Sequence, residues 1–129
     1  TSNWHVGERA HRGTQNVLQR NNIPYDGRGR QFERSDFNRF DYILAMDRSN
    51  FNDILRLAPR TQEFVSKNCV RVPDGPEITL FLSYAYEAGS VDVLEVPDPY
   101  YTGGFDEVYD LVRAGSAALL DHIRTEHNL

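Results

Sequence analysis

The stretch Phe40-Asp41-Tyr42-Ile43-Leu44-Ala45-Met46 contains the clearest β-strand of this 129-residue sequence. A nearly continuous apolar run of this length is typical of a strand that is buried on both faces of a parallel sheet. Asp47 ends the run and can cap a following helix. In that helix, apolar side chains recur at positions i, i+3, i+4 and i+7: Phe51, Ile54, Leu55 and Ala58. A buried strand that leads into an amphipathic helix indicates an α/β domain.

Other segments extend this pattern in both directions along the chain. A helix is predicted at about residues 8–21, and it ends before Ile23-Pro24 because proline cannot continue a helix. The remaining predictions are a helical turn at 35–37, a short helix at 62–68, a buried strand at 78–82, a loop at 84–97 and a helix at 105–126. This alternation predicts a single α/β domain over residues 1–129, with helices on both faces of a parallel sheet in three layers.

Two predicted strands are few for a sheet that three sizeable helices must cover. We therefore expect strand material to be missing from the domain. The chain also begins at Thr1, and its only methionine is Met46, whereas a reading frame opens with methionine. Both observations predict that the domain is truncated at its N-terminus.

The composition predicts a cytoplasmic protein without a membrane partner. With 40% hydrophobic residues in 129, the chain is large enough to bury a core. No apolar run approaches the length of a membrane span. Cys69 is the single cysteine, which excludes an internal disulfide and fits a reducing compartment.

Charge is distributed unevenly along the chain. Residues 1–39 hold seven arginines against four acidic residues, a balance of +3, whereas residues 74–129 hold eleven acidic residues against two arginines, a balance of −9. A basic first third suits nucleic acid or the rim of an anionic site. The arginines are scattered and lack the interleaved aromatics of single-strand binders. We therefore expect solvated surface and no nucleic-acid partner.

Several kinds of chemistry find no support in the sequence. The four histidines have no metal-ligand spacing, so no metal site is expected. Neither a nucleotide-binding P-loop nor a dinucleotide-binding glycine motif occurs, so no cofactor is expected. Gly27-Arg28-Gly29-Arg30 is predicted to be a flexible basic connector. Cys69 has no adjacent helix start or basic cluster to favour a thiolate, and we expect it to be structural or incidental.

The stretch Val96-Pro97-Asp98-Pro99-Tyr100-Tyr101 is the best candidate for chemistry. A residue before proline is pushed out of the helical region, so Asp98 is held on stiff, extended backbone. Tyr100 and Tyr101 beside it could form walls for a flat ring. An Asp-Pro turn with two packed tyrosines is the alternative interpretation. An acid beside an aromatic slot suits the protonation of a phenolate leaving group.

Several motifs, taken in chain order, resemble those of the low-molecular-weight protein tyrosine phosphatases. The motifs are Trp4-His5-Val6-Gly7, Arg28-Gly29-Arg30-Gln31-Phe32, Phe40-Asp41-Tyr42-Ile43-Leu44-Ala45-Met46-Asp47 with Asn50, Asp98-Pro99-Tyr100-Tyr101, and Phe105-Asp106-Glu107-Val108-Tyr109. The likeness runs from Trp4 to about Ile123 and is weakest over residues 60–96.

The resemblance implies a role for each matching residue. Asp98 would be the general acid that protonates the tyrosine leaving group and then the base that activates water. Tyr100 and Tyr101 would flank the phenyl ring, and Trp4 with His5 would form the opposite wall. Asp47 and Asn50 would be structural, at the junction of strand and helix. The implied substrate is a phosphotyrosine protein or an aryl phosphate; the oligomeric state is left open.

The chain also departs from the family pattern. The family's nucleophile lies in a Cys-x₅-Arg loop after the first strand, and here the sixth residue after Cys69 is Gly75. Gly27 stands where many members have a histidine that braces this loop. The resemblance therefore implies a three-layer fold without its first strand, phosphate loop and first helix. We expect the 129-residue chain to be inactive on its own.

Two other functions stay open at this stage. A non-catalytic relative would keep the aromatic slot and bind phosphotyrosine or a partner without cleavage. An arsenate reductase on the same fold is less favoured, because its chemistry relays oxidation through additional cysteines and Cys69 is alone.

Overall fold

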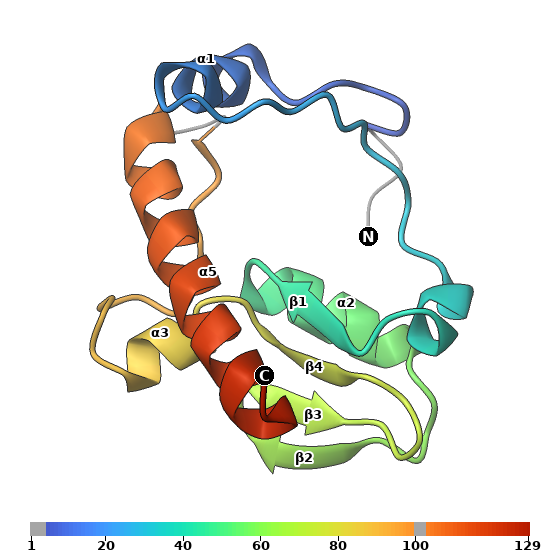
Figure 1. The fold of residues 1–129 in the computed structure, drawn as a ribbon. Helices are drawn as coiled ribbons and strands as arrows, with labels where there is room; N and C mark the ends of the chain where they lie inside the picture. The colour runs from blue at the N-terminus through green and yellow to red at the C-terminus, as the bar shows by residue number, and fades with distance from the viewer. Residues whose placement is uncertain (1–4, 100–102) are drawn as a thin grey trace.

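The computed structural model describes residues 5–99 and 103–129. Its helices are α1 (Arg12–Arg20), the 3₁₀ helix η1 (Arg34–Asn38), α2 (Arg48–Leu57), α3 (Ser83–Glu87) and α5 (Phe105–His127). Its strands are β1 (Tyr42–Ala45), β2 (Glu63–Ser66), β3 (Cys69–Arg71) and β4 (Glu77–Leu80). Figure 1 shows α5 running from the sheet at one end to α1 at the other. None of the helices in the described part of the chain is long and apolar enough to cross a bilayer.

The four strands form one mixed sheet in the order β1-β4-β3-β2. β1 and β4, the two strands that the sequence predicts, pair in parallel, with Ile43 opposite Ile78. β3 is antiparallel to both β4 and β2. The α/β prediction is confirmed, but the predicted count of two strands and the predicted helix at 62–68 are wrong. The count of two strands therefore no longer supports the prediction that strand material is missing.

The hairpin of β2 and β3 escapes prediction for a physical reason. Every residue of β2 is exposed, so the strand has no buried face to impose an alternating pattern on its sequence. Phe64 and Val65 are adjacent and both exposed, which breaks the period of two that marks a half-buried strand. A two-residue turn at Lys67 and Asn68 joins the two strands.

The two faces of the sheet differ in character. Ile43 and Ala45 of β1 are buried on the face that α2 covers, whereas Tyr42 and Leu44 are only half-buried on the other face. The prediction that β1 is buried on both faces is thus correct for one face only. The predicted stripe of α2 packs as expected. The buried core comprises Phe37, Ile43, Ala45, Phe51, Ile54, Ala58, Val70, Val72, Ile78 and Leu80.

A polar cluster around Glu77 occupies the opposite face. The Glu77 carboxylate accepts hydrogen bonds from Tyr84 Oη at 2.5 Å and from Cys69 Sγ at 3.2 Å. Nε2 of His122 faces the same carboxylate at 3.8 Å, and the His122 ring stacks on Tyr84 with centroids 4.1 Å apart. One carboxylate thereby links β3, β4, α3 and α5.

Close packing fixes α5 against the end of β4. A Cβ atom added at Gly115 would lie 2.5 Å from Phe81 Cε2 and 2.9 Å from Leu82 Cδ2, so only glycine fits without displacement of these side chains. At its other end, α5 meets α1 through an ion pair of 2.9 Å between Asp106 and Arg20. The helix therefore sets the position of α1 relative to the sheet.

The bounds of α1 and the loop at 84–97 differ in part from their predictions. α1 begins at Arg12, later than predicted, because His11 Nδ1 accepts a hydrogen bond from Gly13 N and caps it there. Asn22 adopts a left-handed conformation with φ 57°, as expected for the end of this helix. The predicted loop at 84–97 contains the short helix α3, which the sequence analysis missed.

A buried carboxylate organises the connection from residue 30 to β1. Asp36 is 1% exposed and accepts two hydrogen bonds from the Arg30 guanidinium, at 2.8 and 3.1 Å, and one from Glu33 N at 2.9 Å. The Arg30 hydrogen bonds and the backbone donor hold the pKa of Asp36 below its usual range. η1, which contains Asp36, confirms the predicted helical turn.

We expect Asp36→Asn to lower the free energy of unfolding by about 1–3 kcal/mol at neutral pH. The buried carboxylate accepts three hydrogen bonds on two oxygens, and the amide of asparagine has only one acceptor oxygen. A lowered pKa in the folded state stabilises the fold above the unfolded pKa, and this contribution is lost as the pH falls through the folded value. Urea denaturation from pH 7 down to pH 3 should show the difference between variant and wild type shrinking. Asp110→Asn, on the exposed side of α5, serves as the control. A difference independent of pH would contradict the assigned role of the charge.

Candidate active site

A cavity of about 660 Å³ brings together three segments that are far apart in the sequence. The first is the start of the chain with α1, the second is the connector before η1, and the third precedes and begins α5. Its lining residues are His5, Glu8, Arg9, Ala10, His11, Thr14, Tyr25, Gly27, Arg28, Gly29, Asp98, Pro99 and Phe105. The cavity thus contains Asp98 and His5, two residues that the sequence analysis singled out.

Backbone hydrogen bonds place the Asp98 segment at the carboxyl end of β1. Val96 N donates to Met46 O at 2.9 Å, directly beyond the last residue of the strand. The Glu95 carboxylate accepts a hydrogen bond of 2.8 Å from Arg48 N, at the first residue of α2. Ligands of open α/β sheets bind outside the carboxyl ends of their strands. Asp98 therefore lies near the edge of the sheet where a substrate is expected.

Asp98 is presented on backbone that belongs to no helix or strand, as its flanking prolines predict. Its side chain is exposed at the cavity. Tyr100 and Tyr101, predicted to flank the substrate ring, lie outside the described residues, as does Trp4. Of the predicted site residues, the structure therefore describes Asp98 and His5, and it brings these two to one cavity.

Phe105 contributes an aromatic wall that sequence analysis did not assign to the site. It is the first residue of α5. Its ring lines the cavity and stacks on His11 with centroids 5.0 Å apart. One feature of the sequence could have assigned Phe105 to the site. It lies in the first turn of the predicted helix that follows Asp98, the candidate acid.

The other wall is a short antiparallel ladder between two loops. Gly7 N donates to Gly29 O at 2.6 Å, and Gly29 N donates to Glu8 O at 2.8 Å. A Cβ atom at Gly29 would lie 2.4 Å from His5 O, so the close approach of the two loops requires glycine. The connector predicted to be flexible is thus paired with the start of the chain, and Gly27 lines the cavity.

His5 lies on this ladder and forms an exposed pair with Glu8, with Nδ1 and Oε2 2.8 Å apart.

Asp47 and Asn50, expected to be structural, are found at the start of α2. Asp47 Oδ1 accepts a hydrogen bond of 2.8 Å from Asn50 N and caps the helix. Within residues 5–99 and 103–129, no three His, Cys, Asp or Glu side chains are arranged to hold a metal ion.

Cys69 belongs to the polar cluster on β3 and does not line this cavity. Burial, together with the hydrogen bond to the Glu77 carboxylate, raises the pKa of the Cys69 thiol to about 12. A nucleophilic cysteine must be a thiolate near neutral pH. The raised pKa disfavours the thiolate form of Cys69.

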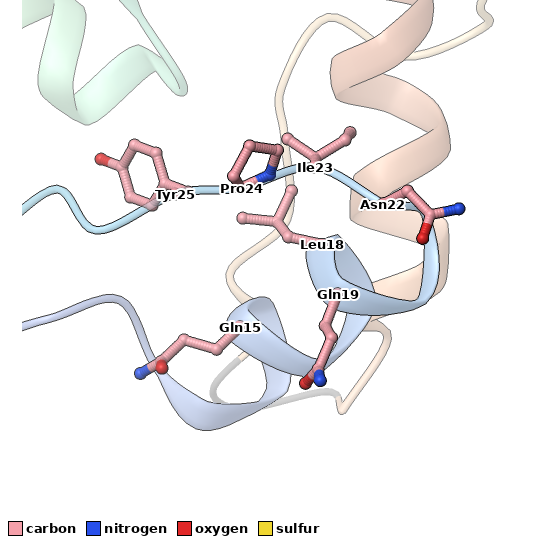
Figure 2. A pocket seen from close by; sticks show the side chains of 7 residues that line it. All are labelled: Gln15, Leu18, Gln19, Asn22, Ile23, Pro24 and Tyr25. Carbon is pink, nitrogen blue, oxygen red and sulfur yellow. The ribbon is translucent and has the colours of Figure 1, made fainter.

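A second hollow, of about 450 Å³, lies beside the first. Figure 2 shows Leu18 of α1 directed toward Pro24, with the amide side chains of Gln15 and Gln19 on the same helix. Tyr25 lines both hollows. The described lining of the second hollow combines amide side chains with the apolar side chains of Leu18, Ile23 and Pro24.

Comparison with known proteins identifies relatives over the whole chain. The family model described as low molecular weight phosphotyrosine protein phosphatase matches residues 1–129. The low molecular weight protein-tyrosine-phosphatase PtpA of Staphylococcus haemolyticus is 37% identical over 130 residues, which cover 100% of this chain and 72% of that protein. PtpA of Staphylococcus aureus is 36% identical with the same coverage.

Solved structures agree with these relatives. The crystal structure of YfkJ from Bacillus subtilis superposes with a TM-score of 0.78 at 36% identity, over 97% of this chain and 70% of that one. The protein tyrosine phosphatase of Entamoeba histolytica, crystallised with Hepes in its active site, gives a TM-score of 0.77 at 27% identity, over 99% and 72%. The chain therefore belongs to the low molecular weight phosphotyrosine protein phosphatase family.

Proposed function

We propose that this protein hydrolyses phosphotyrosine through a cysteinyl-phosphate intermediate, with Asp98 as the general acid and then the general base. The observation that carries the proposal is the position of Asp98. It is an exposed carboxylate at a cavity of about 660 Å³, anchored through Val96 to the carboxyl end of β1. The family to which the chain belongs gives independent support.

In the first step, a cysteine thiolate attacks phosphorus and the bond between phosphorus and the tyrosine oxygen breaks. Protonated Asp98 donates its proton to the departing oxygen, so that neutral tyrosine leaves. In the second step, the Asp98 carboxylate removes a proton from water, which attacks phosphorus. Inorganic phosphate leaves and the thiolate is regenerated. A positioned acid of this kind contributes about 10²- to 10⁴-fold to the rate.

The aromatic ring of the substrate would lie between two walls. Tyr100 and Tyr101 would flank it on the Asp98 side, and Trp4 with His5 would form the opposite wall. The positions of Pro99 and Phe105 on the cavity surface support an apolar slot beside the acid. A flat ring buried between apolar groups favours phosphotyrosine over phosphoserine, which has no ring to fill the slot.

The attacking thiolate is proposed to come from a Cys-x₅-Arg loop outside these 129 residues. The chain has one cysteine, and no arginine follows it at the required position. The raised pKa of Cys69 and its place in the Glu77 cluster also speak against that residue. Backbone amides of such a loop would bind the phosphate oxygens.

Asp98→Asn is expected to lower kcat by about 10²- to 10⁴-fold with little change in KM, because the variant keeps the shape of the side chain but cannot supply a proton. The measurement is steady-state kinetics on a phosphotyrosine peptide, with the polypeptide that carries the loop together with these residues. Asp92→Asn, an exposed acid in the same connection, is the matched control and should leave kcat unchanged. Unchanged turnover in Asp98→Asn would remove the acid from the mechanism.

The 129-residue chain alone should release no phosphate from p-nitrophenyl phosphate above the buffer rate. In the polypeptide that carries the loop, Cys69→Ser should keep kcat within about twofold, because the half-buried thiol belongs to the Glu77 cluster and does not line the cavity. Loss of activity in a Cys69→Ser protein with an unchanged circular dichroism spectrum would show that Cys69 is the nucleophile.

A further inference from the structure

We infer that Arg9 and Arg28 form a paired guanidinium site that binds a carboxylate next to the phosphotyrosine of the substrate. The inference rests on the proposed function and adds a preference among its substrates. It names the chemical class of the preferred partner: a phosphotyrosine segment with an aspartate or glutamate close to the phosphorylated residue.

The two arginines are held side by side by the ladder between the loops. Arg9 and Arg28 are directly opposite each other in an antiparallel bridge. Residues opposite each other in such a bridge have Cβ atoms about 4.5–5.5 Å apart. Arg28 Nη1 donates to Gly7 O at 3.2 Å, which ties the side chain to the ladder. Both residues line the cavity that contains Asp98.

Like charges in opposite positions destabilise an antiparallel pair. Elsewhere the protein balances such charges, since Arg20, Arg30 and Arg56 each form an ion pair with an aspartate at 2.5–2.9 Å. Among the described residues, neither Arg9 nor Arg28 forms an ion pair. An anion bound between the two guanidiniums would remove this repulsion.

The carboxylates of the cavity do not fully cancel the charge of Arg9 and Arg28 in the productive state. Glu8 is paired with His5 at 2.8 Å. Asp98 must hold a proton to protonate the leaving group, so it carries no charge when the substrate is about to react. An incoming carboxylate therefore meets two guanidiniums, whose planar arrays of N–H donors match its two oxygens.

The position of the pair favours a substrate side chain over the phosphate group. The pair shares a cavity with the acid that serves the leaving tyrosine. The leaving oxygen joins the phosphate to the peptide, and the phosphate itself is proposed to bind to the Cys-x₅-Arg loop. Groups around the acid consequently contact the peptide that surrounds the tyrosine.

Three peptides that differ only beside phosphotyrosine, with Glu, Gln or Lys, test the inference through kcat/KM of the polypeptide that carries the loop. The wild-type enzyme should prefer Glu to Gln by about three- to tenfold, as expected for exposed ion pairs. The preference should shrink as salt rises from about 0.05 to 0.5 M. Arg9→Gln and Arg28→Gln should each reduce the ratio, and the double variant should bring it close to one. Replacement of both by Glu should invert it toward the Lys peptide.

Arg60→Gln is the matched control, because Arg60 is exposed and does not line the cavity. It should retain the wild-type ratio. A wild-type ratio near one would overturn the inference, as would an equal loss in Arg60→Gln, which indicates a diffuse charge effect. An equal loss on all peptides and on p-nitrophenyl phosphate would assign the pair to the phosphate and also overturn it. If the wild-type enzyme cleaves neither p-nitrophenyl phosphate nor any peptide, the proposed function fails and the inference with it.

Discussion

The parallel pairing of β1 with β4 is the constraint on which the remaining structure depends. Two parallel strands cannot be joined by a tight turn, so the chain must leave β1, cross over and return. Here α2 and the β2–β3 hairpin make this crossover, and α2 buries the apolar face of the sheet. The pairing also places both strand ends at one edge. Phe81 N donates to Ala45 O at this edge, and Val96 N donates to Met46 O beside it, so the Asp98 segment starts beside the two paired strands.

α5 connects that edge to the other half of the site. Near its end it is held by the Glu77 cluster through His122, and at Gly115 it touches Phe81. At its start, Phe105 enters the cavity and Asp106 holds α1 through Arg20. Figure 1 shows α1 and the first loop at the far end of α5 from the sheet. Residues from the two ends of the chain therefore meet at one cavity because a single helix spans the distance between the sheet and α1.

The parts of the fold that the sequence predicts are those where one face is buried. β1 and α2 are of this kind: β1 buries Ile43 and Ala45 of its apolar run, and α2 buries the apolar stripe that contains Phe51. The β2–β3 hairpin is not, since β2 buries no residue. The start of α1 is also not predictable from the sequence, because His11 caps the helix in place of the usual Ser, Thr, Asp or Asn. In the site, Asp98 is predictable from its local motif, and His5 follows from the family resemblance alone. The Arg9–Arg28 pair is not, because it exists only once two loops pair through backbone atoms.

The central claim is that Asp98 gives its proton to the oxygen that joins phosphate to tyrosine. The most direct test is a crystal structure of the polypeptide that carries the loop, bound to a non-hydrolysable phosphotyrosine peptide. We predict that an Asp98 carboxylate oxygen lies about 2.6–3.2 Å from the atom that replaces the bridging oxygen. A structure in which the ring occupies the cavity while Asp98 points away, and water or another side chain contacts that atom, would contradict the claim.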